Sequence, residues 1–106
     1  MNLTELCEWH LKELDALDVS PADRALCGYF VDEAARLAAA TSSPAFRAVH
    51  VATQAGFLVE CVRAVTTSEA RAATPERLER LARVLRFACA FSDAAHRATI
   101  APEAGK

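Results

Sequence analysis

The chain contains four cysteines, and each falls in a different one of four helical segments. They are Cys7, Cys27, Cys61 and Cys89. Four thiolates that met in the core of a helical bundle could hold a tetrahedral zinc ion. None of these cysteines forms a C-x-x-C pair, and each lies on an expected buried face, where free cysteine behaves as a small hydrophobic residue. We therefore expect buried, reduced thiols and no resident metal, with a metal-binding bundle as one alternative.

A histidine follows the first cysteine at a spacing that could also bind a metal. Cys7 and His10 are three residues apart, so both fall on one helical face. That face is apolar, because Leu3, Leu6 and Leu14 share it. We expect His10 to be a core residue whose ring nitrogen bonds to a backbone carbonyl or a neighbouring hydroxyl.

His50 raises a second alternative, a phosphotransfer domain. Small four-helix domains that relay phosphate carry a histidine on an exposed mid-chain helix, with lysine three residues later and then small residues. Here Thr53 stands at the lysine position, and Gln54 stands where a glycine is expected. The sequence contains no phosphate loop, nucleophile elbow, Glu-x-x-His pair or acid–base dyad. It therefore predicts no catalytic residue and no cofactor, and it favours a role other than that of an enzyme.

Three hydroxyl–proline pairs mark where helices begin: Ser20-Pro21, Ser43-Pro44 and Thr74-Pro75. The hydroxyl can cap free backbone N–H groups, and proline suits the first helical position, where its missing N–H costs nothing. Asn2 can cap an earlier helix in the same way. With the apolar periodicity, these signals predict four helices. The expected ranges are residues 3–17, 21–40, 44–65 and 75–98.

Short connections determine how these helices are arranged. Only about three residues join the first helix to the second and the second to the third, which forces these neighbours to run antiparallel. The longer connection, residues 66–74, lacks glycine and has room for a helical turn of its own. The predicted fold class is all-α, an antiparallel up-down-up-down four-helix bundle. We expect it to form one domain over residues 1–99, followed by a flexible tail, residues 100–106.

The formal net charge of −2 conceals an uneven distribution along the chain. Residues 1–43 hold eight acidic and three basic residues, whereas residues 44–100 hold eight arginines and five acidic residues. We expect acidic and basic helices to lie beside each other within one bundle, with a head-to-tail contact between chains as the other explanation. Four of the arginines step by three and so wind around the last helix, interleaved with glutamates, which argues against a nucleic-acid partner. They are Arg77, Arg80, Arg83 and Arg86.

No apolar run approaches the ~20 residues needed to cross a bilayer. The first residues already form a capped helix with a glutamate in its first turn, so we expect no secretory signal. These features predict a cytoplasmic protein with no membrane partner.

The third helix carries more apolar surface than one core needs. One wide face presents a core pattern from Ala48 to Val65, and the opposite face, which should be charged, is largely apolar as well. We predict that this second face binds a protein partner, most simply a second copy of the chain across a two-fold axis. The alternative is that residues 66–74, the tail or the aromatic residues of the fourth helix cover it. The predicted interaction residues are Phe46, Val49, His50, Thr53, Phe57 and Cys61.

The resulting functional hypothesis is a small protein-interaction module, such as an adaptor, chaperone or regulatory subunit, that forms a homodimer through the third helix. The phosphotransfer domain and the metal-binding bundle remain the alternatives.

Overall fold

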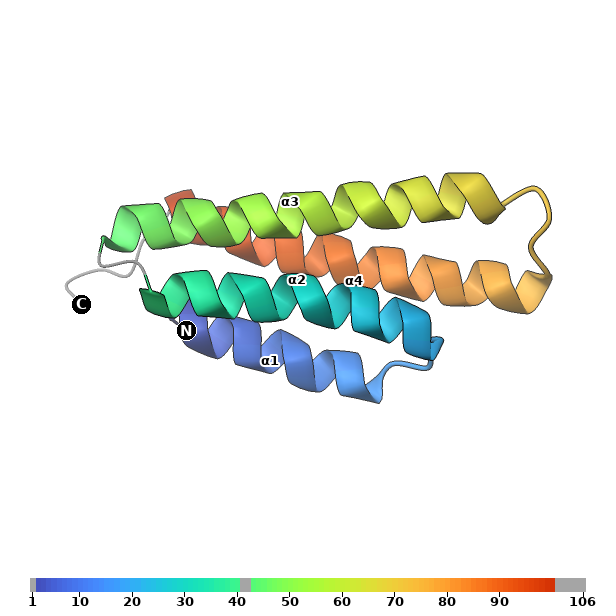
Figure 1. Cartoon of the computed structure of the whole chain (residues 1–106), viewed down its shortest axis with the longest axis horizontal. Helices are drawn as coiled ribbons and strands as arrows, with labels where there is room; N and C mark the ends of the chain where they lie inside the picture. The colour runs from blue at the N-terminus through green and yellow to red at the C-terminus, as the bar shows by residue number, and fades with distance from the viewer. Residues whose placement is uncertain (1, 41–42, 101–106) are drawn as a thin grey trace.

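The computed structural model describes residues 2–40 and 43–100 of the chain. These residues form four α-helices and, within those two ranges, no strand. Consecutive helices run antiparallel and pack side by side, so the predicted up-down-up-down four-helix bundle is confirmed (Figure 1). The helices are α1 (Leu3–Ala16), α2 (Pro21–Ala40), α3 (Pro44–Glu69) and α4 (Pro75–Ile100). Residues 101–106, which make up all but the first residue of the predicted tail, lie outside the described residues.

Local capping explains where three of the helices begin. The Asn2 side-chain oxygen accepts a hydrogen bond from the Glu5 N–H at 2.8 Å, which starts α1. The Ser20 hydroxyl accepts a hydrogen bond from the Asp23 N–H at 3.2 Å. The Thr74 hydroxyl accepts one from the Arg77 N–H at 3.1 Å. At the start of α3, Ser43 occupies the cap position but makes no side-chain capping bond, so the proline after it is the effective signal there.

Helix α3 is longer than the sequence pattern predicts. It continues to Glu69 rather than stopping at Val65, because residues 66–69 contain neither glycine nor proline to end it. The Thr66 hydroxyl donates to the Val62 carbonyl at 2.8 Å, which satisfies the hydroxyl within the helix. As a result, the far end of the α3–α4 hairpin extends beyond α1 and α2 (Figure 1).

The core draws apolar side chains from all four helices. Val51, Ala55 and Leu58 on the inner face of α3 are fully buried, as is Phe91 of α4. Much of the remaining core consists of alanine, valine and cysteine, so the helices can lie close together. Among the described residues, no helix combines the length and the apolar character that crossing a membrane requires.

A charged cluster joins three helices at the end of the bundle that carries the α3–α4 connection. The Arg77 guanidinium of α4 donates two hydrogen bonds to the carboxylate of Asp23 in α2. It donates two more to Glu69, the last residue of α3, at 2.9 and 3.0 Å. Asp23 is one of the two buried polar residues among those described, at 6% exposure. This cluster therefore ties the ends of α2, α3 and α4 together.

Two other arginines hold the connection between α1 and α2. The Arg24 guanidinium donates to the Leu17 carbonyl at 2.6 Å, next to the end of α1. Arg83 of α4 reaches the Asp18 carbonyl at 3.2 Å and its carboxylate at 3.3 Å. Acidic groups of the first half of the chain thus pair with arginines of the second half inside one molecule, which agrees with the expected adjacency of acidic and basic helices.

The charged cluster makes stability depend on pH in a definite direction. Burial raises the pKa of Asp23, but the hydrogen bonds from Arg77 and with Ser20 outweigh it and bring the pKa below its ordinary value. The hydrogen bonds from Arg77 also lower the pKa of Glu69. Both carboxylates therefore stabilise the folded state above about pH 4, the ordinary carboxyl range, and lose that contribution as the pH falls through their lowered pKa values.

We predict that Arg77→Met lowers the free energy of unfolding at pH 7 by about 1–3 kcal/mol, because it leaves the buried Asp23 carboxylate without its partner. The loss of stability between pH 5 and pH 3 should also shrink or reverse in this variant. Urea denaturation across that pH range measures both effects, with Arg80→Met, an exposed position on the same helix, as the control. Equal acid sensitivity in Arg77→Met and the wild type would contradict this assignment.

Candidate functional site

The outer face of α3 is the largest set of exposed apolar side chains that share one helix. Phe46 is 61% exposed, Val49 51% and Phe57 53%. Thr53 on the same face is exposed, and His50 and Cys61 are half-buried. The described residues 66–74 and helix α4 therefore do not cover this face. We call the six predicted interaction residues the α3 strip: Phe46, Val49, His50, Thr53, Phe57 and Cys61.

The polar groups of the α3 strip are partly satisfied within the helix itself. The Thr53 hydroxyl donates to the Val49 carbonyl at 2.8 Å, so it needs no partner outside the helix. The His50 ring stacks on Phe46, with 6.5 Å between ring centroids and 29° between the planes. The strip consequently presents a mostly apolar surface with one imidazole beside an aromatic ring.

The opposite face of α3 forms the core, so the helix is apolar on two sides. Val51, Leu58 and Val62 are at most 1% exposed, while Phe46 and Phe57 are more than half exposed. A surface helix normally has a polar outer face, and a helix that is apolar nearly all round is normally buried on more than one side. Within a single chain, only the inner face of α3 is buried, and the outer apolar face remains exposed.

His10 is a core residue, as the sequence predicts. It is 4% exposed, and its Nδ1 lies 2.8 Å from the Leu6 carbonyl, to which it donates. Its ring contacts Phe91 of α4 with centroids 5.0 Å apart, and the edge of Trp9 at 4.9 Å. Burial lowers the pKa of His10, and the Leu6 carbonyl and nearby Glu13 offset only part of that effect. The ring is therefore neutral at pH 7 and belongs to the α1–α4 packing.

The cysteines divide into two classes. Cys7 and Cys27 are buried, and burial raises the pKa of their thiols to about 11 and about 12. The prediction of burial is wrong for Cys61 and Cys89, which are half-buried. Cys61 lies where the outer face of α3 meets the inner face, and Cys89 packs against the core from its margin. All four are free thiols. In residues 2–40 and 43–100, no three histidine, cysteine, aspartate or glutamate side chains come together to hold a metal ion.

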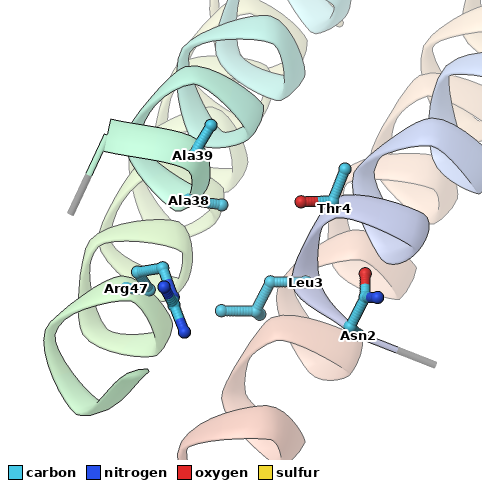
Figure 2. A pocket seen from close by; sticks show the side chains of 6 residues that line it. All are labelled: Asn2, Leu3, Thr4, Ala38, Ala39 and Arg47. Carbon is cyan, nitrogen blue, oxygen red and sulfur yellow. The ribbon is translucent and has the colours of Figure 1, made fainter. Parts of the chain in front are cut away.

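A pocket of about 300 Å³ lies at the opposite end of the bundle from the Asp23 cluster, and the sequence analysis did not identify it. Figure 2 shows Leu3 and Arg47 projecting toward its interior from α1 and α3. It contains no carboxylate, thiol or imidazole, so no acid–base or nucleophilic chemistry follows from its lining. The residues that line it are Asn2, Leu3, Thr4, Ala38, Ala39 and Arg47.

Comparison with known proteins finds no relative of this chain. No protein-family model matches the chain, and no curated protein or solved structure is significantly similar to it. The fold and the site therefore define the class on their own: an antiparallel four-helix bundle with an exposed apolar strip on its third helix.

We predict that His10 makes the protein less stable in mild acid. Because its pKa is lowered in the folded state, the unfolded chain binds more protons as the pH falls below about 6.5, and folding loses free energy. His10→Leu should flatten the fall in unfolding free energy between pH 7 and pH 5. His96→Gln, at an exposed position near the end of α4, is the control. A slope that persists in His10→Leu would show that His10 does not cause it.

We also predict that the thiols react in two stages. Iodoacetamide should modify Cys61 and Cys89 in the folded protein, and Cys7 and Cys27 only after unfolding, since burial and a raised pKa both suppress their thiolates. Intact-mass and peptide mass spectrometry count and locate the adducts. Modification of Cys7 or Cys27 in the folded protein would contradict their burial.

Proposed function

We propose that this chain is a protein-interaction module that forms a homodimer through the α3 strip. The observation that carries the proposal is the exposure of two phenylalanines and a valine on one face of a helix whose other face is already the core. Exposed apolar surface that is contiguous and rimmed by polar residues is typical of protein-binding sites. In this interpretation the partner buries the half of α3 that the single chain leaves exposed.

The size of the strip predicts a weak, reversible association. With Phe46 at 61% exposure and Phe57 at 53%, the two rings still expose roughly 200 Å² together. A stable complex of standard size buries about 800 Å² on each partner. A single-helix contact falls below that value, so we expect exchange between monomer and dimer with a dissociation constant in the micromolar range or weaker.

A second copy suits the strip because the strip is self-complementary. In an antiparallel pair of α3 helices that cross at Thr53, Phe57 comes to the level of the mate's Val49 and His50, and the two-fold axis repeats the same contacts on the other side. One small central residue and two repeated apolar contacts are what a two-fold interface requires. No charged residue belongs to the strip, so like charges do not oppose the contact at its centre.

The same features support the remaining parts of the proposal. Free, buried thiols suit a reducing compartment, which supports a cytoplasmic location. Arginines that pair with Asp18, Asp23 and Glu69 within the chain are less available to phosphates, so we propose neither a nucleic-acid nor a membrane partner. The role would be that of an adaptor, chaperone or regulatory subunit that needs no cofactor.

Neither alternative function gains an observation in its favour. A phosphotransfer site requires a freely accessible imidazole, whereas His50 is half-buried and stacks on Phe46. A metal-binding bundle requires clustered ligands, and in residues 2–40 and 43–100 no three such side chains come together. The α3 strip accounts for His50 and Cys61 as interface residues instead.

We predict that Phe57→Glu gives a folded monomer. The substitution removes apolar contact area and forces a charge into the interface, which should weaken association at least tenfold while leaving the monomer's melting temperature within a few degrees. Sedimentation equilibrium from micromolar to millimolar protein measures the association. Tyr29→Glu is the matched control, because Tyr29 of α2 is 61% exposed but lies outside the strip.

Cys61 provides a second measurement on the unmodified protein. Its alkylation rate should fall as the protein concentration rises and the dimer forms, and it should become independent of concentration in Phe57→Glu. Two results would overturn the proposal: a wild-type chain that remains monomeric at millimolar concentration, or a Phe57→Glu variant that dimerises as well as the wild type.

A further inference from the structure

The far end of the α3–α4 hairpin lacks the buried side chains that hold the rest of the bundle together. Val62 of α3 and Leu81 of α4 are each 1% exposed, and none of the residues between them, all of which the structure describes, is buried. We call this stretch, residues 63–80, the hairpin tip (Figure 1). Apart from alanine and proline, its apolar side chains are Val65, which is half-buried, and Leu78, which is 41% exposed. Apolar packing therefore contributes little to the stability of the tip.

The α3 side of the tip also consists of weak helix formers. Residues 65–68 are valine, two threonines and serine, which all rank below alanine and the long unbranched residues in helix propensity. The Thr66 hydroxyl bonds back to the Val62 carbonyl, a contact that slightly destabilises a helix. No glycine or proline ends α3 before Glu69, but a helix end of this composition depends on tertiary contacts for its stability.

The α4 side of the tip is better supported within its own sequence. The Thr74 hydroxyl caps its first turn, and the residues that follow include glutamate, arginine and leucine, which favour helix. The two halves of the tip therefore differ in how much they need an outside partner. If a contact between them is lost, the last turn of α3 is the part that unwinds.

Arg77 supplies the tertiary contacts of the tip. Its guanidinium donates to both carboxylate oxygens of Glu69, at the end of α3, and to both of Asp23, in α2. The Arg77 side chain is only 23% exposed, so these charge-assisted hydrogen bonds are partly shielded from water. Elsewhere in the part of the chain that the structure describes, no side-chain hydrogen bond or ion pair joins the tip to α1 or α2.

We propose that Arg77 acts as a clasp on the hairpin tip. Its bonds to Asp23 and Glu69 keep the last turn of α3 helical and the tip against α2. When they break, this turn unwinds while the rest of the bundle remains folded. Segments with few buried contacts open at a lower free energy than the core of the same protein. The α3 strip ends at Cys61, outside the tip, so this opening does not depend on the proposed homodimer.

Native-state hydrogen exchange, followed by NMR in increasing urea, tests the opening in the unmodified protein. Relative to their intrinsic rates, the amides of residues 66–70 should exchange at least about tenfold faster than those of Val31 and Phe91 in the core. Their exchange should also respond little to urea, because a local opening exposes little surface. If these amides exchange at the core's rate and with the core's urea dependence, the tip opens only when the whole chain unfolds, and the proposal is overturned.

Arg77→Met distinguishes the clasp from ordinary fraying of a helix end. Methionine keeps an apolar stem but forms none of the four hydrogen bonds, so the amides of residues 66–70 should exchange at least about fivefold faster than in the wild type. The amides of residues 79 and 80, on the capped α4 side, should change less. Arg80→Met, at an exposed position in the same tip, is the matched control. Unchanged exchange at residues 66–70 in Arg77→Met, or an equal acceleration in Arg80→Met, would overturn the clasp.

Discussion

The burial of the inner face of α3 is the interaction on which the rest of this bundle depends. α3 packs against α2 on one flank and α4 on the other, and Val51, Leu58 and Val62 are almost completely inaccessible to solvent. Both neighbours must be long enough to cover this face, whereas α1 is shorter and lies mainly against α2 and α4 (Figure 1). An inner face satisfied in this way leaves the outer face of α3 without a role in folding.

The charged cluster at the end of the bundle compensates for a limit of this core. Much of the core is alanine and valine, which bring helices close together but bury little area per residue. Arg77 connects Asp23 and Glu69 with directional hydrogen bonds. These bonds hold the three longer helices in register at the point where the α3–α4 hairpin extends beyond α1 and α2. A partly buried guanidinium with two carboxylates gains more from this geometry than an exposed ion pair would.

Signals close together in the chain predicted most of the fold, and contacts distant in sequence account for what they missed. Ser20 and Thr74 cap the helices they were expected to begin, because capping involves residues three apart. The burial of Asp23 had no such signal, since its partner Arg77 lies 54 residues away. For the candidate site, the helical period was enough to identify an apolar face left over on α3. It could not show how much of that face the other helices cover, because coverage depends on contacts between residues distant in sequence.

The outer face of α3 is apolar but narrow, and this limits what its exposed side chains can do. Exposed phenylalanines favour any apolar contact, including aggregation. Phe46 and Phe57 lie on one helix, and the Thr53 hydroxyl between them bonds to the Val49 carbonyl of the same helix. The α3 strip therefore offers a short apolar surface without an unsatisfied hydroxyl, which favours a limited contact over an extensive one.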